Sequence, residues 1–151
     1  MKVEEFLRSQ KVPYSKTHHP EAFTAQEVAA TAHVPGARLM KVVVVKAGEE
    51  YALAACPASS RVNLDRLSKL IGRRARLASE AEMEGVLKDA DVGAEPPFGS
   101  LYGMKTYVDG SLALQGEVVF QAGTHTDTIK LSYKDFARIA SPIAGDFADH
   151  L

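Results

Sequence analysis

Four consecutive valines in the segment RLMKVVVVKAG, residues 38–48, restrict the fold more than any other feature. A continuous β-branched run of this length predicts a buried strand. Side chains alternate along a strand, so Lys41 and Lys46, which flank the valines, point to opposite faces. Lys46 precedes a polar turn, and we expect it to reach solvent. Lys41 has apolar neighbours on both sides along the chain, which favours equally a cation that serves a site and one that extends from a strand end to water.

Capping signals divide the rest of the chain into short helices and strands. Thr24 with Glu27 and Ser79 with Glu82 have the spacing of capping boxes, Asn63 is suited to begin a helix that Gly72 ends, and Ser132 is suited to begin the last helix. The predicted helices are residues 3–10, 25–32, 64–71, 80–87 and 133–140. The predicted strands are residues 38–47, 51–58, 105–109, 112–116, 117–123 and 127–132, with extended pieces at 12–19 and 75–78.

This order of elements indicates the fold class. Helices and strands are mixed without a regular βαβ repeat, which predicts an α+β fold with a mixed, strongly curved, barrel-like sheet and surrounding helices. The chain has 151 residues and no break in composition, so we expect a single domain over residues 1–151.

The balance of charges restricts how the chain could bind a nucleic acid. There are 18 basic and 19 acidic residues, so a nucleic-acid partner would need a local basic patch. The run from Arg61 to Arg76 is a candidate, because Arg66, Lys69 and Arg73 are spaced for one helical face and Arg74 follows. These four residues could bind the phosphates of a nucleic acid, or they could form an ordinary solvated helix face.

The sequence also argues against metals, membranes and secretion. Cys56 is the only cysteine, and its apolar strand favours a small buried hydrophobe over a nucleophile. The five histidines lack a ligand spacing, so we expect no metal and no cofactor. The N-terminus lacks an apolar signal core, and no run has the roughly 20 apolar residues that span a bilayer, so we expect a cytoplasmic protein without a membrane partner.

Two polar loops are candidates for a site. GAEPPFG, residues 93–99, combines paired prolines with glycines and can hold a carbonyl rigidly toward water or a ligand. In FQAGTHTDTIKL, residues 120–131, Thr124, His125 and Asp127 gather at a strand end. Each loop alone is more often a structural turn.

The ordered set of these segments resembles the YbaK family, also called the prolyl-tRNA synthetase-associated editing domain. The resemblance covers nearly the whole chain. It rests on HHPEAFTAQEVA, on ARLMKVVVV, on GAEPPFG and on FQAGTHTDTIKL followed by FARIASP. It implies a mixed fold around a closed, barrel-like sheet, and hydrolysis of the ester of mischarged tRNA by a protein that acts in trans. The implied partners are mischarged tRNA and an aminoacyl-tRNA synthetase, with no DNA.

The resemblance also implies roles for individual residues. The family's lysine falls on Lys41, which would bind a phosphate or the developing oxyanion, and the glycine at the reaction centre falls on Gly93. We expect both to be catalytic, mainly through positioning, because no strong base is visible. Val42 after the lysine and Ala94 after the glycine resemble branches that edit alanine, serine or threonine. The expected substrate-binding residues are His19, Thr24, Pro97, Phe98, Gly99, Gly123, Thr124, His125 and Asp127.

Two alternatives remain open at this point. The same pocket could bind aminoacyl-tRNA or a small nucleotide without catalysis, or the chain could be a purely structural interaction module. Turnover of a mischarged tRNA separates the enzyme from the binder. A filled pocket without affinity for tRNA would indicate the structural module.

Overall fold

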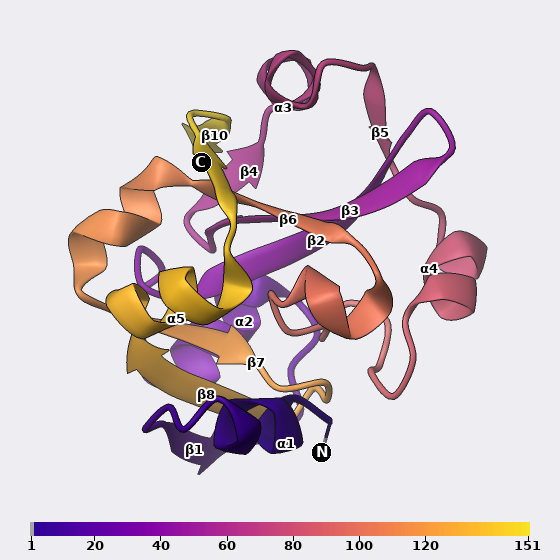
Figure 1. Cartoon of the computed structure of the whole chain (residues 1–151). Coiled ribbons are helices and arrows are strands. Elements are labelled where there is room, and N and C mark those ends of the chain that lie inside the picture. The colour runs from indigo at the N-terminus through magenta and orange to yellow at the C-terminus, as the bar shows by residue number, and fades with distance from the viewer. Residues whose placement is uncertain (1) are drawn as a thin grey trace.

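The valine run forms the second strand of a five-stranded sheet in the computed structural model, which describes residues 2–151. This sheet has the order β5-β2-β3-β6-β9, and β2 pairs antiparallel with both β5 and β3 (Figure 1). Gly48, in the turn between β2 and β3, has a φ of 64°, which suits glycine. The strands are β2 (Met40–Ala47), β3 (Glu50–Pro57), β5 (Ala75–Leu77), β6 (Lys105–Asp109) and β9 (Ile143–Gly145).

The remaining strands form two smaller sheets. β8 (Asp127–Ser132) lies between β1 (Ser15–His18) and β7 (Glu117–Gln121), and β10 (Ala148–His150) pairs with β4 (Ser60–Val62). A bridge between Leu39 and Val119 connects the five-stranded sheet to the three-stranded one. The prediction of a closed, barrel-like sheet is therefore wrong. The strands separate beyond this bridge, so the hydrogen-bonded ladder does not continue around a barrel.

The capping predictions are confirmed. Thr24, Asn63, Ser79 and Ser132 each accept a hydrogen bond from a backbone N–H three residues later, and Gly72 ends α3 with a φ of 88°. These interactions involve neighbouring residues, so they depend little on the rest of the fold. The helices are α1 (Lys2–Ser9), α2 (Ala25–Thr31), α3 (Leu64–Ile71), α4 (Glu80–Val86) and α5 (Tyr133–Ala140), and none of those within residues 2–151 is long and apolar enough to cross a membrane.

Two local predictions differ from the structure. Residues 112–116, predicted as a strand, belong to the 3₁₀ helix η2 (Gly110–Gln115). The Asp109 carboxylate accepts a 3.2 Å hydrogen bond from the Ser111 N–H and so caps this turn, while Leu112 is buried. The segment after Pro142, for which no strand is predicted, contributes β9 and β10, and another 3₁₀ helix, η1 (Gly99–Tyr102), begins where the predicted loop at residues 93–99 ends.

Buried side chains lie on both faces of β2, as the valine run predicts. Val44 packs in one apolar cluster with Leu53, whereas Val45 packs in another with Leu67. A third cluster surrounds Phe98, whose ring centroid lies 5.3 Å from that of Phe120 and 5.6 Å from that of Phe136. This cluster anchors the end of the proline-rich loop to the interior.

Candidate functional site

Backbone hydrogen bonds join the two predicted site loops. The Gly123 N–H donates to the Ala94 carbonyl at 2.9 Å, and the Asp91 N–H donates to the Gly123 carbonyl at 2.8 Å. The Gln121 side-chain amide donates to the Gly93 carbonyl at 3.3 Å. The fold therefore brings segments that are about thirty residues apart into one unit, with the orientation of Gly93 set by Gln121.

His125 covers this unit on one side. A Cβ placed on Gly93 would lie 3.7 Å from Cε1 of His125, and the His125 ring lies 4.7 Å from the ring of Phe23. Phe23 is 61% exposed, which is unusual for a large apolar side chain that already packs on a neighbour. Phe23 lies within the segment HHPEAFTAQEVA but was not predicted as a site residue. The sequence feature that could have revealed Phe23 is its position between a histidine pair and a capped helix.

Three polar atoms near the two loops are buried without a hydrogen-bond partner: Nε2 of His19, Oε1 of Gln121 and Nδ1 of His125. The backbone N–H of His19 donates to the Thr126 carbonyl, which ties His19 to the same loop. Buried polar groups are nearly always paired in folded proteins. The unpaired atoms of Gln121 and His125 beside Gly93 therefore indicate a place for a polar ligand or water.

Glu95 is a site residue that sequence reasoning missed. It is only 2% exposed, and its Oε2 accepts a 2.9 Å hydrogen bond from the Gly93 N–H. Burial raises the pKa of the Glu95 carboxyl to about 7. Glu95 is thus a buried titratable group beside the glycine that was predicted to be catalytic. The sequence feature that could have revealed Glu95 is its position between an alanine and two prolines. A carboxyl group in an apolar loop has few ways to remain solvated.

Asp127 organises the other loop. Its carboxylate accepts from the hydroxyl of Thr124 at 2.6 Å and from that of Thr126 at 3.2 Å, and Nδ1 of His18 lies 3.1 Å away. Burial opposes the charged form, but these hydrogen bonds outweigh it and lower the pKa of Asp127. His18 is exposed and the adjacent His19 is buried.

Lys41 is half-buried on β2, and its ammonium donates to the Ser60 carbonyl. Lys41 lies two residues after Leu39, which bridges Val119, and Gln121 lies two residues after Val119. Among residues 2–151 no carboxylate pairs with Lys41. An ammonium has three donors, so this one retains protons for a ligand.

Cys56 lies directly across the ladder from Lys41. The thiol is fully buried, and burial raises its pKa to about 11 although Lys41 acts in the opposite direction. Cys56 is therefore a neutral thiol at physiological pH, as the prediction of a buried hydrophobe requires.

Lys46 differs from its prediction. Its ammonium lies 3.8 Å from the Glu82 carboxylate and 5.3 Å from the centre of the Tyr51 ring, and the side chain is 25% exposed. The ammonium lies over an aromatic ring and near a carboxylate, because the neighbouring strand and α4 provide partners that the local sequence does not reveal. Lys46 nevertheless lies on the face opposite Lys41, as strand alternation predicts.

Four of the predicted substrate-binding residues make structural contacts within the protein. Thr24 caps α2 through the Glu27 N–H, Pro97 and Phe98 are buried, and a Cβ on Gly99 would overlap the Met104 carbonyl. Thr24 is itself exposed, whereas Pro97, Phe98 and Gly99 are buried and anchor the proline-rich loop. His19, Gly123, Thr124, His125 and Asp127 lie with Gly93 in the joined unit.

The basic run has more acidic partners than the local sequence suggests. Arg66 pairs with Asp146 at 3.1 Å and also with Asp149, and Arg74 pairs with Asp65 at 2.5 Å. Within the described part of the chain, Lys69 and Arg73 are the two predicted tRNA-binding residues that have no carboxylate partner. The C-terminal segment supplies the additional acids, and its position depends on the tertiary fold.

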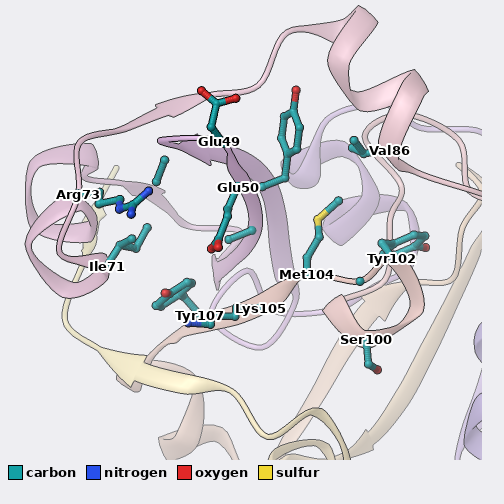
Figure 2. Close-up of a pocket in the computed structure, with 14 residues that line it drawn as sticks. Glu49, Glu50, Ile71, Arg73, Val86, Ser100, Tyr102, Met104, Lys105 and Tyr107 are labelled. Carbon is teal, nitrogen blue, oxygen red and sulfur yellow. The ribbon is translucent and has the colours of Figure 1, made fainter.

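A cavity of about 760 Å³ lies at a different place (Figure 2). Figure 2 shows Arg73 and Ile71 on one side of it, Tyr102 and Met104 on the other, and Glu50 between them. It contains neither Lys41 nor Gly93. This cavity is therefore separate from the candidate site. Among residues 2–151 no three His, Cys, Asp or Glu side chains gather to hold a metal ion.

Comparison with known families decides the assignment. The model of the family described as aminoacyl-tRNA editing domain matches residues 19–139. The chain belongs to the aminoacyl-tRNA editing domain family. The match includes Lys41 and both site loops, and it confirms the resemblance to the YbaK family. No curated protein matches the chain.

Solved structures share this editing-domain fold. The hypothetical protein APE2540 superimposes with a TM-score of 0.90 at 20% identity, over 99% of this chain and 100% of its own. A protein proposed to be a trans-editing enzyme for prolyl-tRNA synthetase superimposes with a TM-score of 0.84 at 20% identity, over 98% of this chain and 95% of its own. A longer protein from Marinobacter aquaeolei, proposed to act in signal transduction, matches 97% of this chain with 30% of its own at 21% identity and a TM-score of 0.75. These identities establish the fold alone.

Proposed function

We propose that this editing domain is an aminoacyl-tRNA deacylase that acts in trans on tRNA carrying the wrong amino acid. The observation that carries the proposal is the Gly93 carbonyl, which Gln121 holds in place beneath His125 within a chain of this family. A rigid carbonyl next to unpaired buried polar atoms is suited to align a water molecule or the amino group of the substrate.

The proposed reaction is hydrolysis of the ester between the amino acid and the terminal ribose. Water adds to the ester carbonyl carbon, the carbonyl oxygen becomes an oxyanion, and the intermediate expels the ribose oxygen, which takes up a proton. The Lys41 ammonium would stabilise the negative charge, because it is half-buried and free of carboxylate partners among residues 2–151. The products are a free amino acid and an uncharged tRNA.

Glu95 would act as a positioning residue. Its carboxyl oxygen holds the Gly93 N–H, while Gln121 holds the carbonyl of the same residue. Both polar groups of Gly93 are therefore restrained, and the reacting water would meet a carbonyl of defined direction. This arrangement is consistent with catalysis mainly through positioning and charge stabilisation.

A small amino acid is the proposed cargo. Val42 and Ala94 occupy the positions at which the resemblance indicates branches that edit alanine, serine or threonine. Size exclusion would admit these amino acids and reject larger side chains. An aminoacyl-tRNA synthetase is the proposed partner, since it supplies the mischarged tRNA.

A panel of mischarged tRNAs tests this function. The purified protein is incubated with tRNAs charged with alanine, serine, threonine and several larger amino acids, and the release of each amino acid is followed. Faster release of a small amino acid supports the deacylase. Tight binding of the same tRNAs without release would instead support a non-catalytic aminoacyl-tRNA-binding module.

A further inference from the structure

A second cavity, of about 250 Å³, lies on the polar face of the three-stranded sheet. Strand pairing builds its floor, because Ser15 lies opposite Lys130 and Thr17 lies opposite Thr128. Alternation places these four side chains on one face, while the residues between them in β8 face the core. Thr128 is only 2% exposed, whereas Lys130 is exposed. The floor therefore combines three hydroxyl groups with one ammonium.

Arg38 forms part of the wall. Its Nε is buried without a hydrogen-bond partner, and within residues 2–151 no carboxylate pairs with its guanidinium. Every titratable side chain that lines the cavity is basic, namely Arg38, Lys130 and His33. A buried guanidinium nitrogen without an acceptor indicates that an acceptor is supplied from outside the chain.

The end of α2 lies beside the cavity, and free carbonyls there would repel an anion. The Ala32 N–H donates to the Val28 carbonyl at 2.9 Å, and the Val34 N–H donates to the Ala29 carbonyl at 2.8 Å. Chain groups therefore satisfy these carbonyls. The cations and hydroxyl groups dominate the surface that a ligand meets.

We propose that this cavity binds a phosphate of the single-stranded 3′ end of the tRNA, an inference that rests on the proposed function. A guanidinium, an ammonium and hydroxyl donors match the oxygens of a phosphodiester. Thr128 pairs with Gln121 across β8 and β7, and Gln121 holds the Gly93 carbonyl. A phosphate at Arg38 would therefore lie on the same sheet face as the candidate reaction centre and would orient the substrate's ester.

Hydrolysis of two minimal substrates tests the inference. One is the 3′-aminoacylated trinucleotide CCA, and the other is 3′-aminoacylated adenosine, which has no phosphate. Arg38→Met and Lys130→Ala should each lower kcat/KM for the trinucleotide about tenfold and change that for the adenosine ester less than twofold. The matched controls are Arg8→Met, at an exposed arginine, and Lys16→Ala, on the opposite face of β1. Equal losses on both substrates, or no loss on either, would overturn the phosphate site.

Binding of uncharged CCA separates this inference from the deacylase proposal. The affinity of a fluorescent trinucleotide should fall about tenfold in Arg38→Met, with a salt slope smaller by about 0.7, as for one contact with a single strand. The parent protein could fail to hydrolyse any ester while Arg38→Met still loses affinity for CCA. That result would support the phosphate site and reject the deacylase proposal. Unchanged affinity and slope in an active deacylase would reject the phosphate site alone. Inorganic phosphate that binds as tightly as CCA would show a site for a free anion and overturn the assignment to tRNA.

Discussion

Gln121 and Gly93 are joined by a hydrogen bond of 3.3 Å from the side-chain amide to the backbone carbonyl, across 28 positions of sequence. Gln121 is at the end of β7 and is 8% exposed. Gly93, which accepts this hydrogen bond, lies in the loop to which the family resemblance assigns the reaction centre. A buried side chain thus sets the direction of the backbone group on which the proposed mechanism depends.

Replacing Gln121 should therefore reduce catalysis more than binding. Gln121→Met keeps the length of the side chain but removes the donor to Gly93. We expect kcat and kcat/KM to fall together by about tenfold, because the aligned carbonyl matters in the transition state. Single-turnover deacylation measures both quantities, and Gln10→Met, at an exposed position, is the control. A higher KM with unchanged kcat would show that Gln121 contributes only to substrate binding.

Lys41 should contribute far more to the rate than Lys46. Loss of one charged donor directed at a developing oxyanion costs about 3 kcal/mol, so Lys41→Ala should lower the rate about a hundredfold while the protein remains folded. Lys46→Ala should change the rate only a few-fold, because its contacts are with Glu82 and Tyr51 on the other face. Deacylation of a common mischarged tRNA and thermal unfolding are measured for both variants. A folded Lys41 variant with near full activity, or a folded and inactive Lys46 variant, would refute the assignment.

Glu95 should make stability depend on pH near neutrality. Burial raises its pKa from 4.5 to about 7 in the folded state, so the folded protein binds a proton that the unfolded chain has released. Stability from this group is complete below about pH 4.5 and is lost as pH rises toward 7, with a total change of about 3 kcal/mol. Glu95→Gln retains an acceptor for the Gly93 N–H but cannot ionise.

The measurement for Glu95 is the free energy of unfolding in urea between pH 4 and pH 8. The difference between Glu95→Gln and the parent protein should move by about 3 kcal/mol in favour of the variant as pH rises. Other acidic groups, including Asp127, titrate equally in both proteins and cancel. Parallel pH profiles would show that Glu95 ionises in the folded protein as easily as in water.

Lys69 and Arg73 should account for the contribution of the basic run to tRNA affinity. Arg66 and Arg74 already have carboxylate partners, whereas these two residues have none among residues 2–151. The double variant Lys69→Ala/Arg73→Ala should weaken binding of all tRNAs alike and reduce the salt slope by about 1.8, as for two contacts with a duplex. Filter binding at several salt concentrations measures this, with Arg8→Ala/Lys134→Ala as the control. An unchanged slope would assign α3 to an ordinary solvated surface.

The sequence by itself determined the features that depend on neighbouring residues. The four helix caps, the glycine that ends α3 and the opposite directions of Lys41 and Lys46 follow from interactions over a few positions. The order of the segments also identified the family, because such motifs have a defined sequence and spacing. Residues 112–116 show the limit of this approach, since a buried leucine beside a capping aspartate formed a 3₁₀ helix where alternation had indicated a strand.

Only the tertiary structure decided which distant groups meet. The burial of Glu95, the bond from Gln121 to Gly93 and the pairing of Arg66 with Asp146 and Asp149 join positions that local patterns cannot relate. The open sheet was decided in the same way, because closure requires that β2 and β7 remain hydrogen-bonded beyond one bridge. Burial and charge pairing depend on everything that packs around a group. The electrostatic character of this site was therefore established by the fold and not by its motifs.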